Sequence, residues 1–233
     1  MAAVCSPHRE SEDIIMLALD DKQKDFVTLC LHHPMWKTKF KYHTYKSSET
    51  ILSIGAPITH FGIVVEGILK AENYTRDGNE LCGAYFEYHD VFPEFLYFNG
   101  ERNYAYSLVC AKRTEVAWLP VKDFEDMIET DADIMYAFML YLSRRGLKNQ
   151  LLLNCLNYQT IRERIAFWLL GMSSLANKEI LLLPCSQTMW ANMLRVSRSS
   201  LNQELKHMEQ EGCFQRDGRH LIILDKQRLE DIL

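Results

Sequence analysis

Residues 186–211 constrain the fold most, because they combine two helical repeats with a turn signal between them. A first short helix is predicted from Ser186 to about Leu194, and the small Ala191 on its inner side lets a second helix cross closely. Ser197 is a good N-cap for that second helix, because its hydroxyl can accept from the free amides of the next turn. The segment therefore predicts a helix-turn-helix.

The second helix of this pair divides into an apolar and a polar face. Leu201, Leu205 and Met208 recur at helical spacing and are expected to face inward. The opposite face carries donors and acceptors of the kind that read base edges and grip phosphates. The residues expected to contact DNA are Ser186, Gln187, Arg195, Ser197, Arg198, Ser199, Asn202, Gln203 and Lys206. The alternative is an ordinary helical hairpin with a solvated polar face.

Two short apolar runs follow, at residues 213–214 and 221–224, around an Asp217-Gly218 turn signal. A β-hairpin after a helix-turn-helix is a wing, and Arg216 and Arg219 are expected at its tip, near DNA phosphates. The alternative is a capping hairpin whose basic tip is only solvated. With the wing included, binding to double-stranded DNA is the favoured function.

Composition and charge narrow the class of protein. No window of the 233 residues approaches twenty apolar residues, so no membrane span is expected. No apolar stretch of signal-peptide type begins the chain, so we expect it in the cytoplasm. Residues 159–233 carry 10 basic and 9 acidic side chains, whereas residues 1–158 carry 16 and 22. An acidic body with a locally basic end suits a sequence-specific reader rather than a general nucleic-acid coat.

Metal, redox and catalytic signatures are weak. The 7 cysteines have neither Cys-x-x-Cys nor zinc-finger spacing, and the 8 histidines form no metal pattern, so we expect no metal and no cofactor. Free, buried thiols are the default, with a redox-sensing Cys82 or Cys110 as the alternative. The chain has no Gly-rich phosphate loop, Gly-x-Ser-x-Gly or His-Glu-x-x-His, so we expect no enzyme and no catalytic residues.

Residues 36–120 have a different character, with short runs rich in Ile, Val, Tyr, Phe and Thr between turn signals. Short strands at this spacing suggest an antiparallel double-sheet roll or barrel. Short helices are expected before and after it, at residues 20–31 and 121–129. The candidate strands are residues 40–45, 50–54, 61–65, 67–74, 81–88, 107–111 and 115–119, and the turns are 55–57, 66–67, 77–78 and 99–100.

Residues 131–157 contain neither Pro nor a loop cluster, which predicts a helix of about 40 Å. A helix that long cannot bury its apolar stripe against a small roll alone. We therefore expect it to pair with a second copy of itself as a parallel two-stranded coil, the alternative being a core helix of a monomer. The expected interface residues are Ile134, Phe138, Tyr141, Leu142 and Leu152.

The predicted class is α+β, in three parts. An antiparallel, jelly-roll-like β-roll (a double-stranded β-helix) takes residues 1–130, a dimerisation helix takes 131–158, and a winged helix-turn-helix takes 159–233. In this order the parts resemble the Crp/Fnr family of bacterial transcription regulators. The residues that carry the resemblance are Ile54-Gly55, Val65-Glu66-Gly67, Asp77-Gly78, residues 90–95, residues 197–201, Glu204-Leu205 and Glu211-Gly212.

The resemblance implies a homodimer whose roll binds a small effector. Effector binding would re-aim the two recognition helices on a palindromic operator, with RNA polymerase as a further partner. Arg198 could then contact guanine through two hydrogen bonds, and Gln203 would favour adenine or make water-bridged contacts. The two half-sites are expected about 10–10.5 bp apart. Arg195 stands where this motif often has Gly, so a positive φ there would bring modest strain.

Departures from the family bear on the effector. Members that bind cyclic nucleotide hold its phosphate with an Arg-Ser pair, and Tyr104-Ala105 stands at that position here. Burying a phosphate without a cation is costly, so no cyclic nucleotide is expected. Closely spaced N-terminal cysteines for an iron–sulfur cluster are also missing, because only Cys5 precedes Cys30.

The aromatic residues of the roll suggest a different effector, a small apolar or aromatic molecule. The expected pocket residues are Phe86, Phe92, Glu94, Tyr104 and Tyr106. Two alternatives stay open: the aromatics are plain core, or the protein is a constitutive DNA-binding dimer without an effector.

Overall fold

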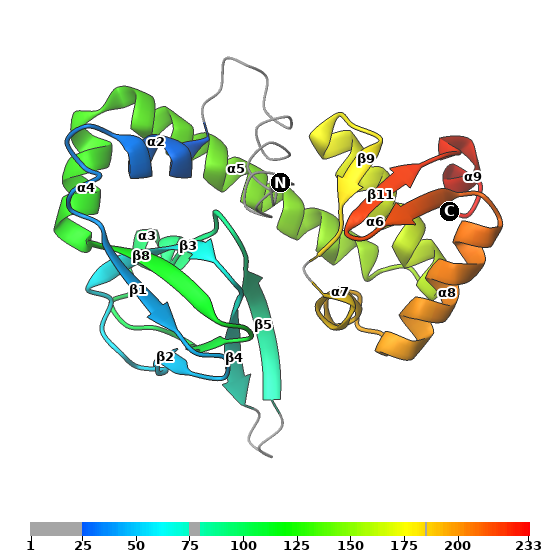
Figure 1. The fold of residues 1–233 in the computed structure, drawn as a ribbon, viewed down its shortest axis with the longest axis horizontal. Coiled ribbons are helices and arrows are strands. Elements are labelled where there is room, and N and C mark those ends of the chain that lie inside the picture. Colours follow the sequence, from blue (N-terminus) through cyan, green and yellow to red (C-terminus); the bar gives the residue numbers. More distant parts are fainter. Residues whose placement is uncertain (1–24, 75–79, 185) are drawn as a thin grey trace, which may run out of the picture. The chain divides into compact units, whose positions relative to one another are not determined.

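The computed structural model describes residues 25–74, 80–184 and 186–233. Its contacts divide the chain into two compact units, with the boundary between Met139 and Leu140. We call residues 25–139 the roll unit and the described residues from 140 onward the winged unit (Figure 1). Helix α5 (Ala132–Cys155) contributes to both. None of the helices in the described ranges is long and apolar enough to cross a lipid bilayer.

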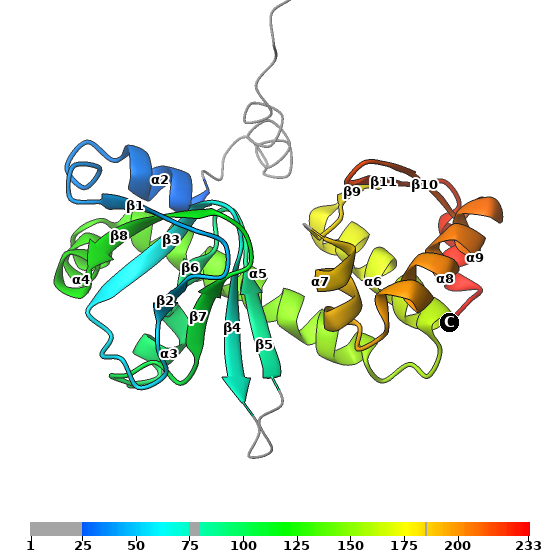
Figure 2. The ribbon, with the colours of Figure 1, turned by 60° about the horizontal axis from the view of Figure 1, so that its bottom comes forward.

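Two antiparallel sheets of four strands form the roll unit, in the orders β1-β8-β3-β6 and β2-β7-β4-β5 (Figure 2). The predicted antiparallel double-sheet roll is therefore confirmed. The strands are β1 (Lys41–Tyr45), β2 (Thr50–Leu52), β3 (His60–Glu66), β4 (Leu69–Tyr74), β5 (Glu80–Phe86), β6 (Val91–Phe92), β7 (Ser107–Cys110) and β8 (Thr114–Pro120). The helices are α2 (Phe26–His32), α3 (Glu94–Phe98) and α4 (Val121–Thr130).

The core of the roll lies between these sheets. Val64 and Val116 from one sheet and Leu69 and Leu108 from the other are completely buried in one cluster. This burial explains the runs of β-branched and aromatic residues, since removal of apolar surface from water supplies most of the stabilising free energy. The β-carbon of an alanine at Gly62 would lie 2.3 Å from the ring of Phe92, its cross-strand partner on β6, so this position of the sheet has no room for a side chain.

The strands and helices differ from the predicted ones in a few places. Helix α3 and strand β6 were not predicted. The N-cap residue of α3 is Pro93, which makes no side-chain capping bond, so the sequence offers no local start signal there. Strand β2 ends at Leu52 rather than at residue 54. The predicted turn at residues 77–78 and the start of the predicted helix at residues 20–24 lie outside the described residues.

In the winged unit, a three-stranded sheet in the order β10-β11-β9 lies over one side of helices α6, α7 and α8 (Figure 2). Its elements are α6 (Ile161–Ala176), β9 (Ile180–Leu182), α7 (Gln187–Met193), α8 (Arg198–Gln210), β10 (Phe214–Asp217), β11 (His220–Ile223) and α9 (Lys226–Glu230). The rings of Trp168 and Trp190 meet in the core with centroids 5.0 Å apart. The predicted helix-turn-helix and wing are both present.

Helix α5 confirms the predicted long helix, but two of its expected interface residues are elsewhere. Ile134 and Phe138 are only 1% and 3% exposed. Phe138 packs on Phe124 and Phe26 inside the roll unit, with ring centroids 5.4 and 4.9 Å away. The roll unit itself already covers these side chains, which argues against their predicted placement at a dimer interface.

Candidate nucleic-acid interface

Both helices of the helix-turn-helix begin at serine N-caps. The Ser186 hydroxyl accepts from the backbone N–H of Met189 at 3.1 Å, and the Ser197 hydroxyl accepts from that of Ser200 at 3.0 Å. These bonds satisfy amides that the helices themselves cannot pair. The predicted N-cap role of Ser197 is confirmed.

A left-handed residue makes the turn between the helices. Arg195 has a φ of +53°, as its position in the sequence suggested, and this conformation costs a non-glycine residue modest free energy. The N–H of Val196 donates to the carbonyl of Ala191 at 2.9 Å and so closes the turn. The Arg195 side chain itself is exposed.

Helix α8 has the two faces that its sequence predicts. Leu201, Leu205 and Met208 are completely buried in the core of the winged unit. On the opposite face, Arg198, Gln203 and Lys206 are exposed. Asn202 is less accessible, because its side chain is half-buried. The exposed group expected to contact DNA also includes Gln187, Arg195, Ser197 and Ser199.

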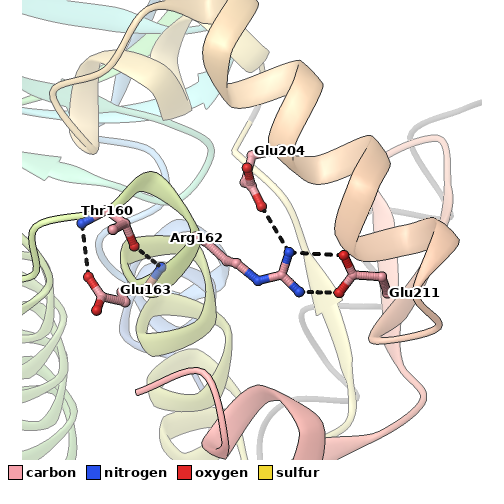
Figure 3. Close-up of polar contacts among 5 residues, drawn as sticks. All are labelled: Thr160, Arg162, Glu163, Glu204 and Glu211. Carbon is pink, nitrogen blue, oxygen red and sulfur yellow. Dashed lines mark hydrogen bonds and ion pairs between the residues drawn. The ribbon is translucent and has the colours of Figure 1, made fainter.

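An ion-pair cluster that the sequence analysis did not identify joins α8 to α6 (Figure 3). Arg162 Nη1 donates to Glu204 Oε1 at 3.3 Å and to Glu211 Oε1 at 3.0 Å, and its Nη2 donates to Glu211 Oε2. The hydrogen bond from Arg162 holds the pKa of the Glu211 carboxyl below its ordinary value. Glu204 of α8 and Glu211, its C-cap residue, are therefore both bonded to one residue of α6, which fixes the orientation of the exposed face of α8.

The start of α6 is itself capped. The Thr160 hydroxyl accepts from the N–H of Glu163 at 3.1 Å, while the Glu163 carboxylate accepts from the N–H of Thr160 at 2.9 Å (Figure 3). This capping box satisfies two amides reciprocally, and the backbone bond holds the pKa of Glu163 below its ordinary value. The capping box therefore fixes the backbone of the first turn of α6, which carries Arg162.

The wing is formed by β10 and β11, which pair from Phe214 with Ile223 to Asp217 with His220. Arg216 was expected at the tip but lies within β10, where its guanidinium pairs with Glu209 of α8. The guanidinium of Arg216 is therefore held against α8 by this ion pair and not at the turn of the hairpin. Arg219 does lie at the turn, and its guanidinium donates to the carbonyl of Leu183 at 2.9 Å. Phosphate contacts by either arginine stay predictions.

Comparison with known proteins agrees with this geometry. Residues 163–232 match the family model of the Crp-like helix-turn-helix domain, and residues 42–131 match that of the cyclic nucleotide-binding domain. The chain belongs to the Crp/Fnr family. Regulators of this family bind DNA through the helix-turn-helix and typically act as dimers.

Individual relatives are distant. The cAMP-activated global transcriptional regulator CRP of Pasteurella multocida is 21% identical over 186 residues, which is 78% of this chain and 88% of that protein. CooA of Carboxydothermus hydrogenoformans is similar in structure, with a TM-score of 0.68, 15% identity and coverage of 93% of this chain and 98% of CooA. CprK in complex with OCPA has a TM-score of 0.61 at 17% identity, covering 84% and 90% of the two chains. At such identities the likeness in structure concerns the fold.

In the roll unit, the residues expected to bind an effector pack mainly against one another. Phe86, Phe92 and Tyr104 are members of the core cluster, and the rings of Phe86 and Phe92 lie 5.4 Å apart. Glu94 is also buried, at 2% exposed, and Tyr106 packs partly buried against the cluster. A cavity of about 330 Å³ opens beside Tyr104, and the other four residues do not line it. Binding of an effector by these four stays a prediction.

The cysteines of this Crp/Fnr-family chain were the basis of the redox alternative. Cys30, Cys110, Cys155 and Cys213 are buried and free. Burial raises the pKa of the Cys110 thiol and brings that of Cys155 to about 11. Oxidation proceeds through the thiolate, so a raised pKa disfavours oxidation of these two thiols. The side chain of Cys82 lies outside the described residues.

Proposed function

We propose that this DNA-binding regulator recognises a palindromic operator as a homodimer and responds to a small, non-nucleotide effector. The observation that carries the proposal is the division of α8. One face is completely buried at Leu201, Leu205 and Met208, and the other exposes Arg198, Gln203 and Lys206. This division favours insertion of the amino end of α8 into the major groove.

Individual roles follow from position and chemistry. Arg198 lies in the first turn of α8, where a guanidinium can donate two hydrogen bonds to one guanine. Gln203 is one turn further along and suits adenine, while Lys206 reaches backbone phosphates. The polar residues around the two N-caps suit contacts with backbone phosphates. Such contacts orient α8 on the DNA but do not distinguish one base from another. These residues are Ser186, Gln187, Arg195, Ser197 and Ser199.

We place the dimer contact on the exposed face of α5. Within the roll unit this face carries Tyr136, which is 54% exposed, and within the winged unit it carries Leu147 and Leu153, which are 51% and 65% exposed. Met139, which is 51% exposed, is a further large apolar residue of this helix, and we propose that these exposed apolar side chains make the contact with the second copy. Tyr141 and Leu142, which are half-buried, flank it. Leu152 packs partly buried against the core of the winged unit.

The effector is proposed to differ from a cyclic nucleotide. Tyr104 stands where a phosphate-binding arginine would be needed, and its buried ring brings no positive charge. The similarity in fold to CprK, which is complexed with OCPA, supports a bound small molecule in a protein of this fold. A constitutive dimer without an effector is the second candidate. We also propose RNA polymerase as a partner and assign the chain no catalytic role.

Selection of bound DNA from a random pool tests the recognition model. A palindrome with one G·C pair per half-site and half-site centres about 10–10.5 bp apart is expected. Arg198→Ala should weaken binding by about 1–3 kcal/mol per half-site and relax the preference at that base. Arg198→Lys is the matched control, because it retains the charge but loses the paired donors. If the Arg198→Ala variant selected the same sequences as the parent, the assignment of Arg198 would be wrong.

Sedimentation of the purified protein tests the dimer. The parent should sediment as two subunits at micromolar concentration, and Leu147→Glu with Leu153→Glu should sediment as one. Operator binding by the ligand-free parent separates the two candidate functions. Full affinity without additive favours the constitutive dimer, whereas affinity restored by a cell extract favours the effector.

A further inference from the structure

Arg164 lies near the start of α6, where its half-buried side chain connects two segments that are far apart in the sequence. Its Nε donates to the carbonyl of Tyr158 at 2.9 Å, and its Nη1 donates to the carbonyl of Leu194, also at 2.9 Å. Tyr158 follows the end of α5, and Leu194 is the C-cap residue of α7. One guanidinium therefore bridges the end of the long helix and the turn of the helix-turn-helix.

The Leu194 carbonyl is a suitable acceptor because it lies at the end of a helix. The last carbonyls of an α-helix have no partner within the helix and carry partial negative charge, so a guanidinium is favourable there. The next residue is Arg195, whose positive φ makes the turn before α8, and the N–H of Val196 closes this turn on Ala191. The bond from Arg164 thus holds the residue that directly precedes the left-handed turn.

The end of α5 is held against α6 by two further contacts. The thiol of the completely buried Cys155 donates to the backbone carbonyl of Arg164 at 3.0 Å. Burial raises the pKa of Cys155 to about 11, so the thiol keeps the proton that it donates. The Tyr158 ring packs on the Phe167 ring of α6, with centroids 4.9 Å apart. Residues 155–158 are therefore fixed to α6, and Arg164 extends this connection to the turn.

Arg162 and Arg164 are two residues apart on α6 but hold different segments. Arg162 bonds to Glu204 and Glu211 and so orients α8 on α6 (Figure 3). Arg164 joins the turn before α8 to the segment that leaves α5. In a dimer that is joined along α5, the bonds of Arg164 determine how rigidly each α8 follows its own α5.

We propose that Arg164 is a positioning residue that sets which spacing between half-sites the dimer accepts. The inference rests on the proposed function, because it requires a dimer joined along α5 and a palindromic operator. Each base pair added between the half-sites moves one of them by about 3.4 Å and rotates it by about 35°. A dimer whose two α8 helices are held rigidly to α5 cannot follow that displacement. Without the Arg164 bonds, the helices can follow it more easily.

The experiment measures binding of the full chain to operators whose central spacing is one base pair shorter or longer than that of the selected site. The readout is the ratio of the affinities for the correct and the shifted spacing. A shifted operator requires the Arg164 bonds of the parent to break, whereas Arg164→Met has already lost them. One hydrogen bond to a charged group is worth about tenfold in an equilibrium constant, so the ratio should fall about tenfold. The base preference within each half-site should be unchanged, because the exposed side chains of α8 are the same.

Arg228→Met is the matched control, because Arg228 is exposed in the same unit and pairs with Asp225. It removes the same charge and should keep the spacing ratio of the parent. Arg164→Gln has a shorter side chain that cannot span the two carbonyls, so it should repeat the effect and serves if Arg164→Met folds poorly. A general loss of stability lowers the active fraction for every operator and leaves the ratio unchanged, so the ratio separates positioning from folding.

Hydrogen exchange of the backbone amides at residues 192–197 tests the same bonds without DNA. Exchange in this turn should be faster in Arg164→Met than in the parent or in Arg228→Met. The inference fails if this exchange is unchanged, if both Arg164 variants keep the spacing ratio of the parent, or if Arg228→Met lowers the ratio equally. A parent that binds single half-sites without a spacing preference would refute the dimer of the proposed function. The exchange result would then still decide whether Arg164 holds the turn.

Discussion

Glu209→Gln perturbs the contact that anchors the wing to α8. Glu209 Oε1 accepts from the backbone N–H of Arg216 at 2.8 Å, and Oε2 accepts from Arg216 Nε at 3.1 Å and from Nη2 at 2.6 Å. The glutamate and arginine side chains are 30% and 21% exposed. Glutamine retains the size of the side chain but removes its charge and one of its two acceptor oxygens.

The expected cost comes from the lost charge. A hydrogen bond to a charged group contributes about 1.5–3 kcal/mol when buried. Solvent reaches this partly exposed pair and reduces that contribution, so the free energy of unfolding should fall by about 1–2 kcal/mol at pH 7. The Arg216 hydrogen bond holds the pKa of Glu209 below its ordinary value of 4.5. The charged form is therefore favoured in the folded state. Its stabilisation is present above pH 4.5 and is lost as the pH falls through the lower folded-state pKa.

Urea unfolding at pH steps from about 7 to 3.5, followed by tryptophan fluorescence, measures this difference. Trp168 and Trp190 report on the core of the winged unit, and Trp36 and Trp118 contribute the signal of the roll unit. The gap between parent and Glu209→Gln should narrow as the pH falls below 4.5. Glu230→Gln is the matched control, because Glu230 is exposed in the same unit and its replacement should leave the unfolding free energy unchanged at every pH. A gap that stays constant down to the lowest pH would refute the role assigned to the carboxylate charge.

Three further changes test the packing. Gly62→Ala should destabilise the roll by about 1–3 kcal/mol, because its β-carbon would lie 2.3 Å from the buried Phe92 ring. In a Phe92→Leu background the same substitution should cost less. A double-mutant cycle measured by urea unfolding compares the two costs. Thr160→Ala removes the cap of α6 and should cost about 1 kcal/mol, or a drop of about 2–4 °C in the thermal midpoint by calorimetry. Phe138→Ala should cost about 3–5 kcal/mol in thermal unfolding of the roll, yet leave the association constant in sedimentation unchanged at temperatures where it is folded. Weaker association of the folded Phe138→Ala variant would instead support the prediction that Phe138 lies at the dimer interface.

Local patterns in the sequence were sufficient for the elements of the DNA-reading motif. The serines at 186 and 197 cap the helices they precede, and Leu201, Leu205 and Met208 fall on one face because the α-helix repeats every 3.6 residues. The left-handed turn at Arg195 and the hairpin at Gly218 follow from the same short-range geometry. Each of these signals depends on a few neighbouring residues, so it can be recognised in the sequence before the rest of the fold is known.

Only the tertiary structure decided which side chains are exposed to a partner and which are occupied by contacts within the protein. Arg162 meets Glu204 and Glu211 across 42 and 49 residues of sequence, and no local pattern encodes a pairing over that separation. Phe138 has the spacing of a dimer contact but is buried by the roll unit, since an apolar stripe does not specify which apolar surface covers it. The cavity beside Tyr104 exists for the same reason, because it joins strands that are neighbours only after the sheets have formed.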